Sequence, residues 1–416
     1  NQVCSMAHSR NGSGLLSVDA ALDRILASLS TTTTTRVLLT DALGQILAED
    51  IHATLTLPPQ DVSAMDGYAV RADDVAQCPA NLTRVGEAAA GHPWTGHVEP
   101  GQAVRIFTGG YVPNGADTII IQENVDAPSE ADHSVITVRE GAAKGRYIRP
   151  AGLDIAAGAH ALAKGSLLSA RSIGLAIAAG ATSAVVSKPP RIGILSTGDE
   201  LVPPGQTPGP GQIISSNAAF LSAFVKSCGA EAVDLGIAID KPGAVSNAVM
   251  AATNLDMVVT TGGASVGSHD HIVDDLADGA LDFWKIAMRP GKPLIWGKIG
   301  KTPLLGLPGN PVSTAVCALV FLAPAINKLG GGTYQQQLFS ATITSDLPEN
   351  DQRQDYMRAS LESGDDGLTM VRPAQRQDSS MMATLAHANA FIVRPPFDPP
   401  LTAGDTVTIL PMPRLF

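Results

Sequence analysis

The sequence predicts a multidomain protein of the α/β plus β class. Its 416 residues are too many for one ordinary hydrophobic core and favour about two to four domains. Between residues 191 and 327, apolar strands alternate with helical stretches, which is typical of a parallel sheet covered by helices on both faces. On either side of this region, segments of alternating polar and apolar residues predict β-rich domains.

The N-terminal region begins with an amphipathic helix and continues as strands. Apolar residues recur at helical spacing from Val18 to Leu29, and charged residues between them argue against a signal peptide. The threonine tract at 30–36 is expected to be a linker or a helix end. Further on, Asn114-Gly115 supplies a turn with positive φ. The strands expected around it are "RIFTGG" (105–110), "TIIIQENV" (118–125) and "SVITVRE" (134–140).

Helices and strands alternate in the central region, and strands return after it. A helical pattern at 169–180 precedes "SKPP" (187–190), which marks a domain boundary. The buried strands expected beyond it are 191–196, 232–239, 256–261 and 303–307, with helices at 216–229 and 243–254. After 327–334, a small all-β domain is expected from "FSATITSDL", "QDYMRASLES", "AFIVRPP" and "DTVTILP".

Composition argues against several classes of partner. The formal charge of −11 and the 4% of aromatic residues disfavour nucleic acid and anionic membranes. The four cysteines are far apart and form no C-x-x-C motif, so a disulfide framework and a zinc cluster are not indicated and a reducing cytoplasm fits best. The apolar stretches 172–187 and 314–327 are short or contain Gly and Pro, so buried helices are expected instead of membrane spans.

Three loops carry the strongest signs of a ligand site. In a doubly wound sheet, ligands bind outside the carboxyl ends of the strands. Paired glycines after a strand let the backbone approach a phosphate. A proline and a serine mark the start of a helix, whose N-terminal end carries positive partial charge and also favours an anion. The three loops that follow predicted strands are Ser196-Thr197-Gly198-Asp199-Glu200, Thr261-Gly262-Gly263-Ala264-Ser265 and Pro308-Gly309-Asn310-Pro311-Val312-Ser313.

Several residues in and near these loops allow two interpretations. Gly263 to Gly267 fits the G-x-S-x-G pattern, so Ser265 is either a nucleophile or an anion-contacting loop residue. Asp199-Glu200 is either a helix cap or, beside a phosphate, a Mg²⁺ site. "RPGKP" (289–293) is either a solvated turn or an anion site, and Asp66-Gly67 in "SAMDGYAV" is by itself a turn. His269, Asp270 and His271 alternate in direction, which disfavours zinc.

Six motifs together resemble those of the molybdopterin molybdenumtransferases, the family of MoeA and the gephyrin E-domain. Their order and spacing match over nearly the whole chain, and neither a P-loop nor a Rossmann fingerprint is present. The motifs are "SAMDGYAV", "RIFTGGYVPNGAD", "LSTGDEL", "TTGGASVGSHD", "MRPGKPL" and "GLPGNPVS".

The resemblance implies a reaction and an architecture. Members of this family insert molybdate into adenylated molybdopterin and release AMP and molybdenum cofactor, with Mg²⁺ assisting. The implied chain has a split N-terminal domain (15–58 and 144–187), an inserted β-rich domain (59–143), a three-layer α/β molybdopterin-binding domain (188–331) and a C-terminal β-barrel (332–416). It would form an elongated cytoplasmic homodimer, with a molybdopterin adenylyltransferase and molybdoenzyme maturation proteins as further partners.

The resemblance also assigns site residues by motif. The residues implied at the molybdate end are Asp66, Thr108 and Asp154, and those implied around the nucleotide, metal and pterin are Asp199, Glu200, Asp240, Gly262, Gly263, Ser265, Pro308, Gly309, Asn310 and Asp270. Of these, Asp199, Glu200 and Asp240 would hold Mg²⁺. The basic pair is Arg289 and Lys292, and the C-terminal positions are Arg358 and Ser379.

Three positions depart from the family pattern. Arg289 stands where the family usually has lysine. Asp274 stands after the "S-V-G-x-x-D" element, at a position where the family commonly has lysine, and Asp378 stands where the family has glycine. The first keeps the charge and changes its geometry. The two acidic residues would weaken an anion site if they faced it.

The resemblance favours the anion-contacting role for Ser265, since a hydrolase would need a longer sheet before its elbow and a suitably placed His after it. Two other functions stay open. One is a molybdopterin adenylyltransferase-like enzyme, which would need the α/β domain alone. The other is a scaffold like gephyrin, which nothing in this sequence requires.

Overall fold

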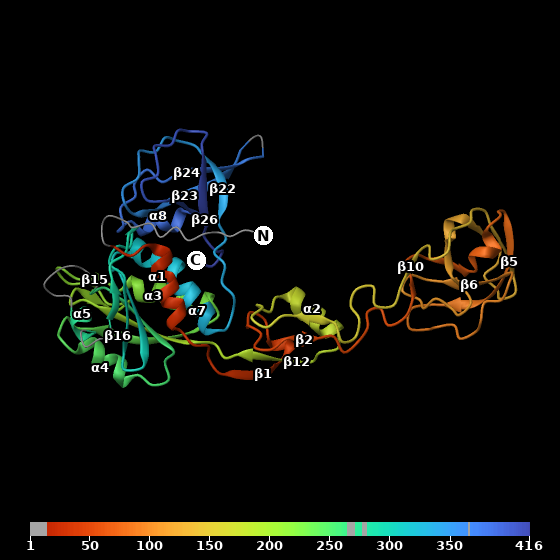
Figure 1. Ribbon diagram of the computed structural model, residues 1–416, viewed down its shortest axis with the longest axis horizontal. Helices are drawn as coiled ribbons and strands as arrows, with labels where there is room; N and C mark the ends of the chain where they lie inside the picture. Colours follow the sequence, from red (N-terminus) through yellow and green to blue (C-terminus); the bar gives the residue numbers. More distant parts are fainter. Residues whose placement is uncertain (1–14, 264–270, 277–280, 365–366) are drawn as a thin grey trace, which may run out of the picture.

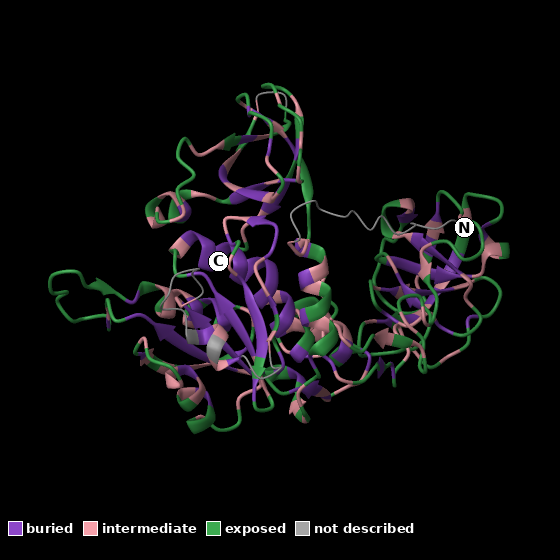
Figure 2. Cartoon of the chain, turned by 60° about the vertical axis from the view of Figure 1, so that its left-hand side comes forward, coloured by how far each residue is buried: buried purple, intermediate pink, exposed green. Residues whose placement is uncertain are grey.

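The computed structural model describes residues 15–263, 271–276, 281–364 and 367–416. The chain is elongated (Figure 1): the α/β domain and the C-terminal domain lie at one end, the split domain lies in the middle, and the inserted domain lies at the other end. Figure 2 shows that the α/β domain contains the largest concentration of buried residues. The multidomain α/β plus β fold class is therefore confirmed.

Helix α1 (Val18–Ser28) forms as expected and packs on the α/β domain. The Ser17 hydroxyl caps it by accepting the N–H of Ala20. Its buried face, which includes Ala21 and Ile25, joins the same core cluster as helix α7 (Ala323–Leu329). The predicted boundary at residue 15 assigns α1 to the split domain, whereas its apolar face is buried in the α/β core.

The split domain is built from small antiparallel pairs of strands far apart in sequence. The threonine tract is not only a linker, because its β-branched residues Thr34 and Thr35 open a strand. The pairs are β1 (Thr34–Leu38) with β12 (Ser183–Ser187), β2 (Ile51–His52) with β11 (His160–Leu162), and β3 (Val62–Ser63) with β10 (Ile148–Arg149). A short 3-10 turn, Leu39–Asp41, follows β1.

The expectation of a buried helix over 172–187 is wrong. Helix α2 (Ala170–Ala178) ends early, and the chain becomes strand β12 at Ser183. Gly180 has φ +95°, and a Cβ there would come 2.1 Å from Thr54 Oγ1. The glycine therefore stops the helix, and the β-branched residues after it favour a strand. Helix α2 is also only partly buried, since Ile177 is 46% exposed.

The inserted domain is a six-stranded sheet, as its alternating pattern predicts. Its strand order is β7-β4-β6-β5-β9-β8. Gly67 opens β4 and is not a simple turn residue, because a Cβ there would come 1.9 Å from the Ile120 carbonyl oxygen of β7. The strands are β4 (Gly67–Val70), β5 (Ala80–Ala88), β6 (Gln102–Ile106), β7 (Thr118–Ile121), β8 (Val125–Asp126) and β9 (Val135–Val138), with 3-10 turns at Ala72–Val75 and Gln122–Asn124.

The α/β domain has a mixed sheet, where a parallel one was expected. Its order is β16-β13-β17-β21-β20-β18, and only the first four strands are parallel. Gly300, with φ +59°, lies in the two-residue connection between β20 and β21, and so short a connection forces an antiparallel pair. The strands are β13 (Arg191–Thr197), β16 (Glu231–Ala238), β17 (Met257–Thr261), β18 (Leu281–Trp284), β20 (Ile295–Ile299) and β21 (Thr302–Leu307).

Helices cover both faces of this sheet, as expected. One buried cluster contains α1, α3 and the helices after β21, and the other contains α4 and α5. The helices are α3 (Ser216–Ser227), α4 (Ala244–Ala251), α5 (His271–Asp275) and α6 (Pro311–Cys317). Helix α6 continues through a π-helical segment (Ala318–Leu322) into α7. The run 311–329 is long and apolar enough for a membrane span, but most of it is buried in the α/β domain, as a core helix would be.

The C-terminal domain is a closed five-stranded barrel. The order β23-β24-β22-β26-β25 closes because β25 also pairs with β23. The α/β domain adds the two-residue strand β19 (Met288–Arg289), which pairs with the start of β23. The barrel strands are β22 (Phe339–Ile343), β23 (Gln354–Ser363), β24 (Thr369–Pro373), β25 (Ala390–Arg394) and β26 (Thr406–Pro411), with helix α8 (Met382–His387) beside them.

Candidate active site

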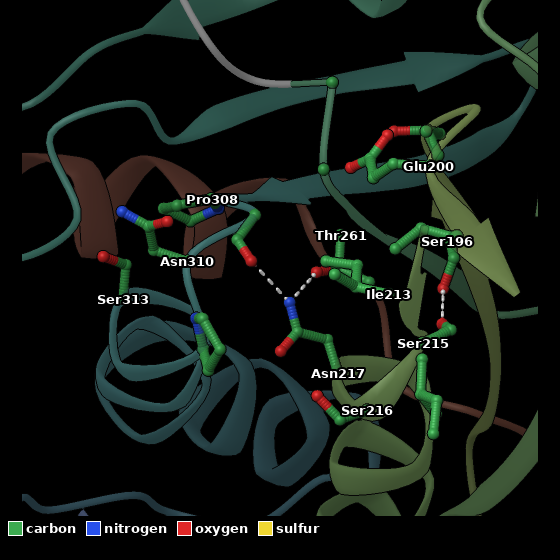
Figure 3. A pocket seen from close by; sticks show the side chains of 18 of the residues that line it. Ser196, Glu200, Ile213, Ser215, Ser216, Asn217, Thr261, Pro308, Asn310 and Ser313 are labelled. Atoms are coloured by element: carbon green, nitrogen blue, oxygen red, sulfur yellow. Dashed lines mark hydrogen bonds between the residues drawn. The ribbon is translucent and has the colours of Figure 1, made fainter. Parts of the chain in front are cut away.

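The three predicted loops meet in one pocket at the carboxyl ends of β13, β17 and β21 (Figure 3). These strands are neighbours and parallel, so their following loops must lie side by side. The pocket has a volume of about 610 Å³. The expected site residues that line it are Glu200, Asp240, Gly262, Gly263, Pro308, Gly309 and Asn310. This part of the candidate site is brought together as the sequence predicts.

Glycine is required where the second loop passes the first. Gly262 and Gly263 have φ values of +91° and +62°. A Cβ at Gly262 would come 2.3 Å from the Thr197 carbonyl oxygen, and a Cβ at Gly263 would come 2.7 Å from Thr197 Oγ1. Both residues therefore expose bare backbone at the pocket wall, where a ligand can approach closely.

Acidic residues lie on one side of this pocket. The Glu200 carboxylate folds back over Gly198, where a Cβ would lie 2.5 Å from Glu200 Oε2. Asp199 Oδ1 accepts the backbone N–H of Asp240 at 3.1 Å, which ties the first loop to the end of β16. No helix begins at Asp199-Glu200, because strand β14 (Leu201–Val202) follows and pairs with β15 (Ile213–Ile214), so the helix-cap interpretation is wrong.

Metal ligands are not preassembled in the described part of the chain. Within it, no group of three or more His, Cys, Asp or Glu side chains is placed to hold a metal ion. Glu200 and Asp240 nevertheless line the pocket together. Mg²⁺ is commonly held by one or two carboxylates plus the phosphates of a substrate, and this donor set fits that mode.

Asn217 is a site residue that the sequence motifs did not reveal. Its Nδ2 donates to Thr261 Oγ1 at 2.9 Å and to the Gly309 carbonyl oxygen at 2.7 Å (Figure 3). It therefore joins helix α3 to the second and third loops. A polar residue in the first turn of a helix resembles an ordinary end residue, and only the three-dimensional contacts identify its role.

A second cavity adjoins the first, between the α/β domain and the barrel. Its volume is about 560 Å³, and it shares Pro293 and Ser313 with the first pocket. Asn310 Nδ2 donates to Ser379 Oγ at 2.8 Å, which links the third loop to the barrel at this border. The four basic and C-terminal residues that the resemblance assigned all line this cavity: Arg289, Lys292, Arg358 and Ser379.

Arg289 is not the free cation that the motif suggested. Its guanidinium forms ion pairs with Asp351 and Asp355 and donates to Asn350 Oδ1 at 3.0 Å. The hydrogen bond to Asp355 is the main reason that the pKa of Arg289 is raised above its usual value. Because these three partners belong to the C-terminal domain, Arg289 joins the α/β domain to the barrel.

We expect Asp355→Ala to loosen this junction. Asp355 is buried, and its loss leaves the half-exposed Arg289 with Asp351 as its one ion-pair partner in the described part of the chain, so a destabilisation of about 1 to 3 kcal/mol is expected. Differential scanning calorimetry should show a lower first transition. Glu362→Ala, which removes an exposed ion pair on the same strand, is the control and should change little. Equal transitions in the two variants would contradict the junction role.

Arg358 and Asp378 shape the barrel loop that carries Ser379. Arg358 is 1% exposed, and its guanidinium donates to the carbonyl oxygens of Arg376 and Asp378 and to Gln377 Oε1. Its pKa is lowered, mainly by desolvation. Asp378 accepts the Ser380 hydroxyl and N–H, and the pKa of its carboxyl is lowered mainly by that hydroxyl. Both side chains hold the loop, so their bonds are already committed within the fold.

Lys292 differs from these two arginines. It is exposed and lines the second cavity. Among the described residues, its ammonium has no ion-pair or hydrogen-bond partner. Of the two cations in "RPGKP", Lys292 is therefore the one whose charge is available to an anion.

Asp66 and Thr108 form a separate cluster on the inserted domain. Asp66 Oδ1 accepts the Thr108 N–H at 2.7 Å and the Thr108 hydroxyl at 2.8 Å. The N–H bond is the largest cause of the lowered pKa of Asp66. Arg105, which sequence reasoning missed, lies close by and holds the backbone of Gly67 through its Nη1 at 3.0 Å. Its guanidinium also packs on the rings of Tyr68 and Phe107.

This cluster lies away from the two cavities in the same chain. The inserted domain is at the opposite end of the molecule from the α/β domain, with the split domain between them (Figure 1). Asp154 lies in a third place, in the turn after β10, where its N–H donates to the Leu57 carbonyl oxygen and its side chain is exposed. The described contacts do not join Asp154 to Asp66. Ser265, Asp270 and the side chain of Asp274 lie outside the described residues.

Comparison with known proteins gives matches along most of the chain. Family models match residues 16–180 as the MoeA N-terminal region (domain I and II), 193–328 as a probable molybdopterin binding domain, and 340–412 as the MoeA C-terminal region (domain IV). The fold and these matches define a class, that of modular proteins built around a molybdopterin-binding α/β domain with a C-terminal barrel.

Individual relatives narrow the class to a family. A molybdopterin molybdenumtransferase of Haemophilus influenzae is 35% identical over 96% of this chain and 100% of its own, and one of Bacillus subtilis is 33% identical over 94% and 93%. A crystal structure of the molybdopterin biosynthesis MoeA protein of Pyrococcus horikoshii superposes with a TM-score of 0.82 at 28% identity, covering 96% of this chain and 100% of that one. The chain belongs to the MoeA family of molybdopterin molybdenumtransferases.

Proposed function

We propose that this protein inserts molybdate into adenylated molybdopterin and releases AMP and molybdenum cofactor. The observation that carries the proposal is the pocket of three strand-end loops, which is lined by bare glycine backbone and by two carboxylates. Such a pocket suits a phosphate-linked ligand, and the second cavity, which shares Pro293 and Ser313 with it, would give a long substrate further room. The family relatives named molybdopterin molybdenumtransferase support the same reaction.

The residues have distinct roles in this proposal. Gly262 and Gly263 let the phosphoanhydride lie against the backbone, and Asn217 holds their loop and the Gly309 loop at a fixed separation. Glu200 and Asp240 would hold Mg²⁺ together with the phosphates, and Asp199 would position Asp240 through its backbone. Bound Mg²⁺ would neutralise the charge on the phosphate oxygens as AMP leaves.

We further propose that the active form is a cytoplasmic homodimer in which each site takes residues from both subunits. Asp66 and Thr108 are distant from the strand-end pocket of their own chain, and a second subunit would bring its inserted domain to that pocket. Large apolar side chains are exposed on the split domain, which suits burial against a partner: Leu38, Leu43, Leu55, Leu167 and Ile177. The cysteines of the described residues, Cys78, Cys228 and Cys317, are free thiols, as a reducing compartment requires.

The proposed reaction is tested directly by measuring the release of AMP. The protein is incubated with adenylated molybdopterin and Mg²⁺, with and without molybdate, and AMP is measured by chromatography. We expect release that depends on molybdate. Consumption of ATP with free molybdopterin, without molybdate-dependent AMP release, would favour the adenylyltransferase alternative. Absence of both reactions, with binding of a receptor-type partner, would favour the scaffold.

We expect Asn217→Ala to slow AMP release about tenfold while the protein stays folded. The change removes two hydrogen bonds, each worth about 0.5 to 1.5 kcal/mol, that hold two loops of the pocket. Release rates and thermal melting are measured on the same samples. Asn247→Ala, at an exposed position of helix α4, is the matched control. A release rate equal to that of the control would show that Asn217 is not needed to position the loops.

A further inference from the structure

The guanidinium of Arg105 joins two segments of main chain that meet at Asp66. Its Nη1 donates to the carbonyl oxygen of Gly67 at 3.0 Å, and its Nη2 donates to Gln122 Oε1 at 2.8 Å. The backbone N–H of Gln122 in turn donates to the Asp66 carbonyl oxygen at 3.1 Å. Because Asp66 and Gly67 are consecutive, these three hydrogen bonds close a ring of contacts around the peptide bond between them.

Two aromatic rings fix the guanidinium in this arrangement. Its central carbon lies 4.6 Å from the centroid of the Phe107 ring and 5.2 Å from that of the Tyr68 ring. Tyr68 is buried and lies opposite Arg105 in the register of β4 and β6. A planar guanidinium can pack on aromatic faces while its edge donates hydrogen bonds. Arg105 therefore presents its donors to Gly67 and Gln122 from a fixed position.

The charge of Arg105 is not neutralised by a carboxylate. Within the ranges that the structure describes, Arg105 forms no ion pair, and its two hydrogen-bond acceptors are a backbone carbonyl and a neutral amide. The pKa of Asp66 is lowered mainly by the backbone N–H of Thr108, and the charge of Arg105 adds to this effect. Arg105 thus lies close enough to Asp66 to act on it through space as well as through the main chain.

We infer that Arg105 is a positioning residue for the Asp66 carboxylate. The inference rests on the proposed function, in which Asp66 reaches the strand-end pocket of a second subunit. Thr108 orients the carboxylate group itself, while Arg105 fixes the main chain from which that group projects. A displacement of about 1 Å in a reacting group can cost about a hundredfold in rate, so the loss of Arg105 should affect turnover more than substrate binding.

The test compares Arg105→Lys with Arg139→Lys in the full-length protein. Lysine keeps the charge, but its single ammonium cannot reproduce the planar fork that reaches both Gly67 and Gln122. We expect Arg105→Lys to lower kcat for molybdate-dependent AMP release about tenfold or more, with KM for adenylated molybdopterin within about twofold of wild type. Arg139 is an exposed residue of the same domain, and Arg139→Lys should leave both constants unchanged.

A second variant, Gln122→Ala, removes one acceptor and keeps the arginine. We expect it to lower kcat by a smaller factor than Arg105→Lys, because its backbone N–H still holds the Asp66 carbonyl oxygen. Gln122 is exposed, so this variant should fold like wild type. Thermal midpoints are measured for all variants. A merely structural role would lower the midpoint without a selective loss of kcat.

Several results would overturn the inference. One is a wild-type kcat in Arg105→Lys, and another is a rise in KM that accounts for the whole loss of kcat/KM, as expected of a substrate-binding residue. If Arg105→Lys does not fold or melts well below Arg139→Lys, an unchanged kcat in Gln122→Ala would overturn it. The proposed function stands in each of these cases, because wild type still releases AMP with molybdate. If wild type releases none, the proposed function fails, and the inference fails with it.

Discussion

Glu200→Gln is expected to lower molybdate-dependent AMP release by about a hundredfold or more, with little change in the binding of free molybdopterin. Glu200 lines the strand-end pocket with Asp240, and within the described chain neither carboxylate has a basic partner. Two unneutralised carboxylates would repel a phosphoanhydride unless Mg²⁺ lies between them and the phosphates. The neutral amide of glutamine is a much weaker ligand for Mg²⁺.

Rates are measured over a range of Mg²⁺ concentrations, which separates a metal-binding role from a structural one. We expect Glu200→Gln to need more Mg²⁺ and to stay slow at saturation. Glu231→Gln is the matched control, because Glu231 begins a strand of the same sheet at the opposite, amino-terminal edge and pairs with Arg191. An unchanged rate with unchanged Mg²⁺ dependence in Glu200→Gln would reduce this residue to a support of the Gly198 turn.

The sequence predicts the strand-end pocket well because its geometry follows from a general property of parallel sheets. Once β13, β17 and β21 are recognised as buried strands, the loops that follow them must meet at one edge. The antiparallel strands β18 and β20 are harder to predict, because they lie outside the alternation of strands and helices. The end of helix α2 at Gly180 depends on contacts with Thr54, which is distant in sequence.

The sequence is less informative about which charges are free. Arg289 and Lys292 occur in one motif and look equivalent, yet Arg289 is paired with residues about sixty positions further along the chain. Arg358 matches a family position, and its guanidinium is used to hold the loop that carries Ser379. Charge pairing between domains depends on how they pack, and residue type and spacing carry no direct signal for it.

The separation of Asp66 from the strand-end pocket of its own chain (Figure 1) also depends on how the domains are arranged, so residue type and spacing do not reveal it. Asp66→Ala and Glu200→Gln should each be nearly inactive as pure proteins, because each homodimer would lack one needed carboxylate in both clefts. Mixed dimers of the two variants are made by co-expression with two affinity tags. One cleft of each mixed dimer would combine an intact Glu200 with an intact Asp66, so about half of wild-type AMP release is expected.

A second mixed dimer makes this prediction decisive. It pairs a wild-type subunit with a subunit that carries both Asp66→Ala and Glu200→Gln. If each cleft joins the α/β domain of one subunit to the inserted domain of the other, both clefts of this dimer lack one carboxylate, and it should be nearly inactive. If each subunit holds its own complete site, the results are reversed: this dimer keeps about half of the activity, and the mixture of single variants has almost none. The two mixed dimers contain the same substitutions in equal number, so a loss of stability caused by the substitutions themselves cannot produce the expected contrast.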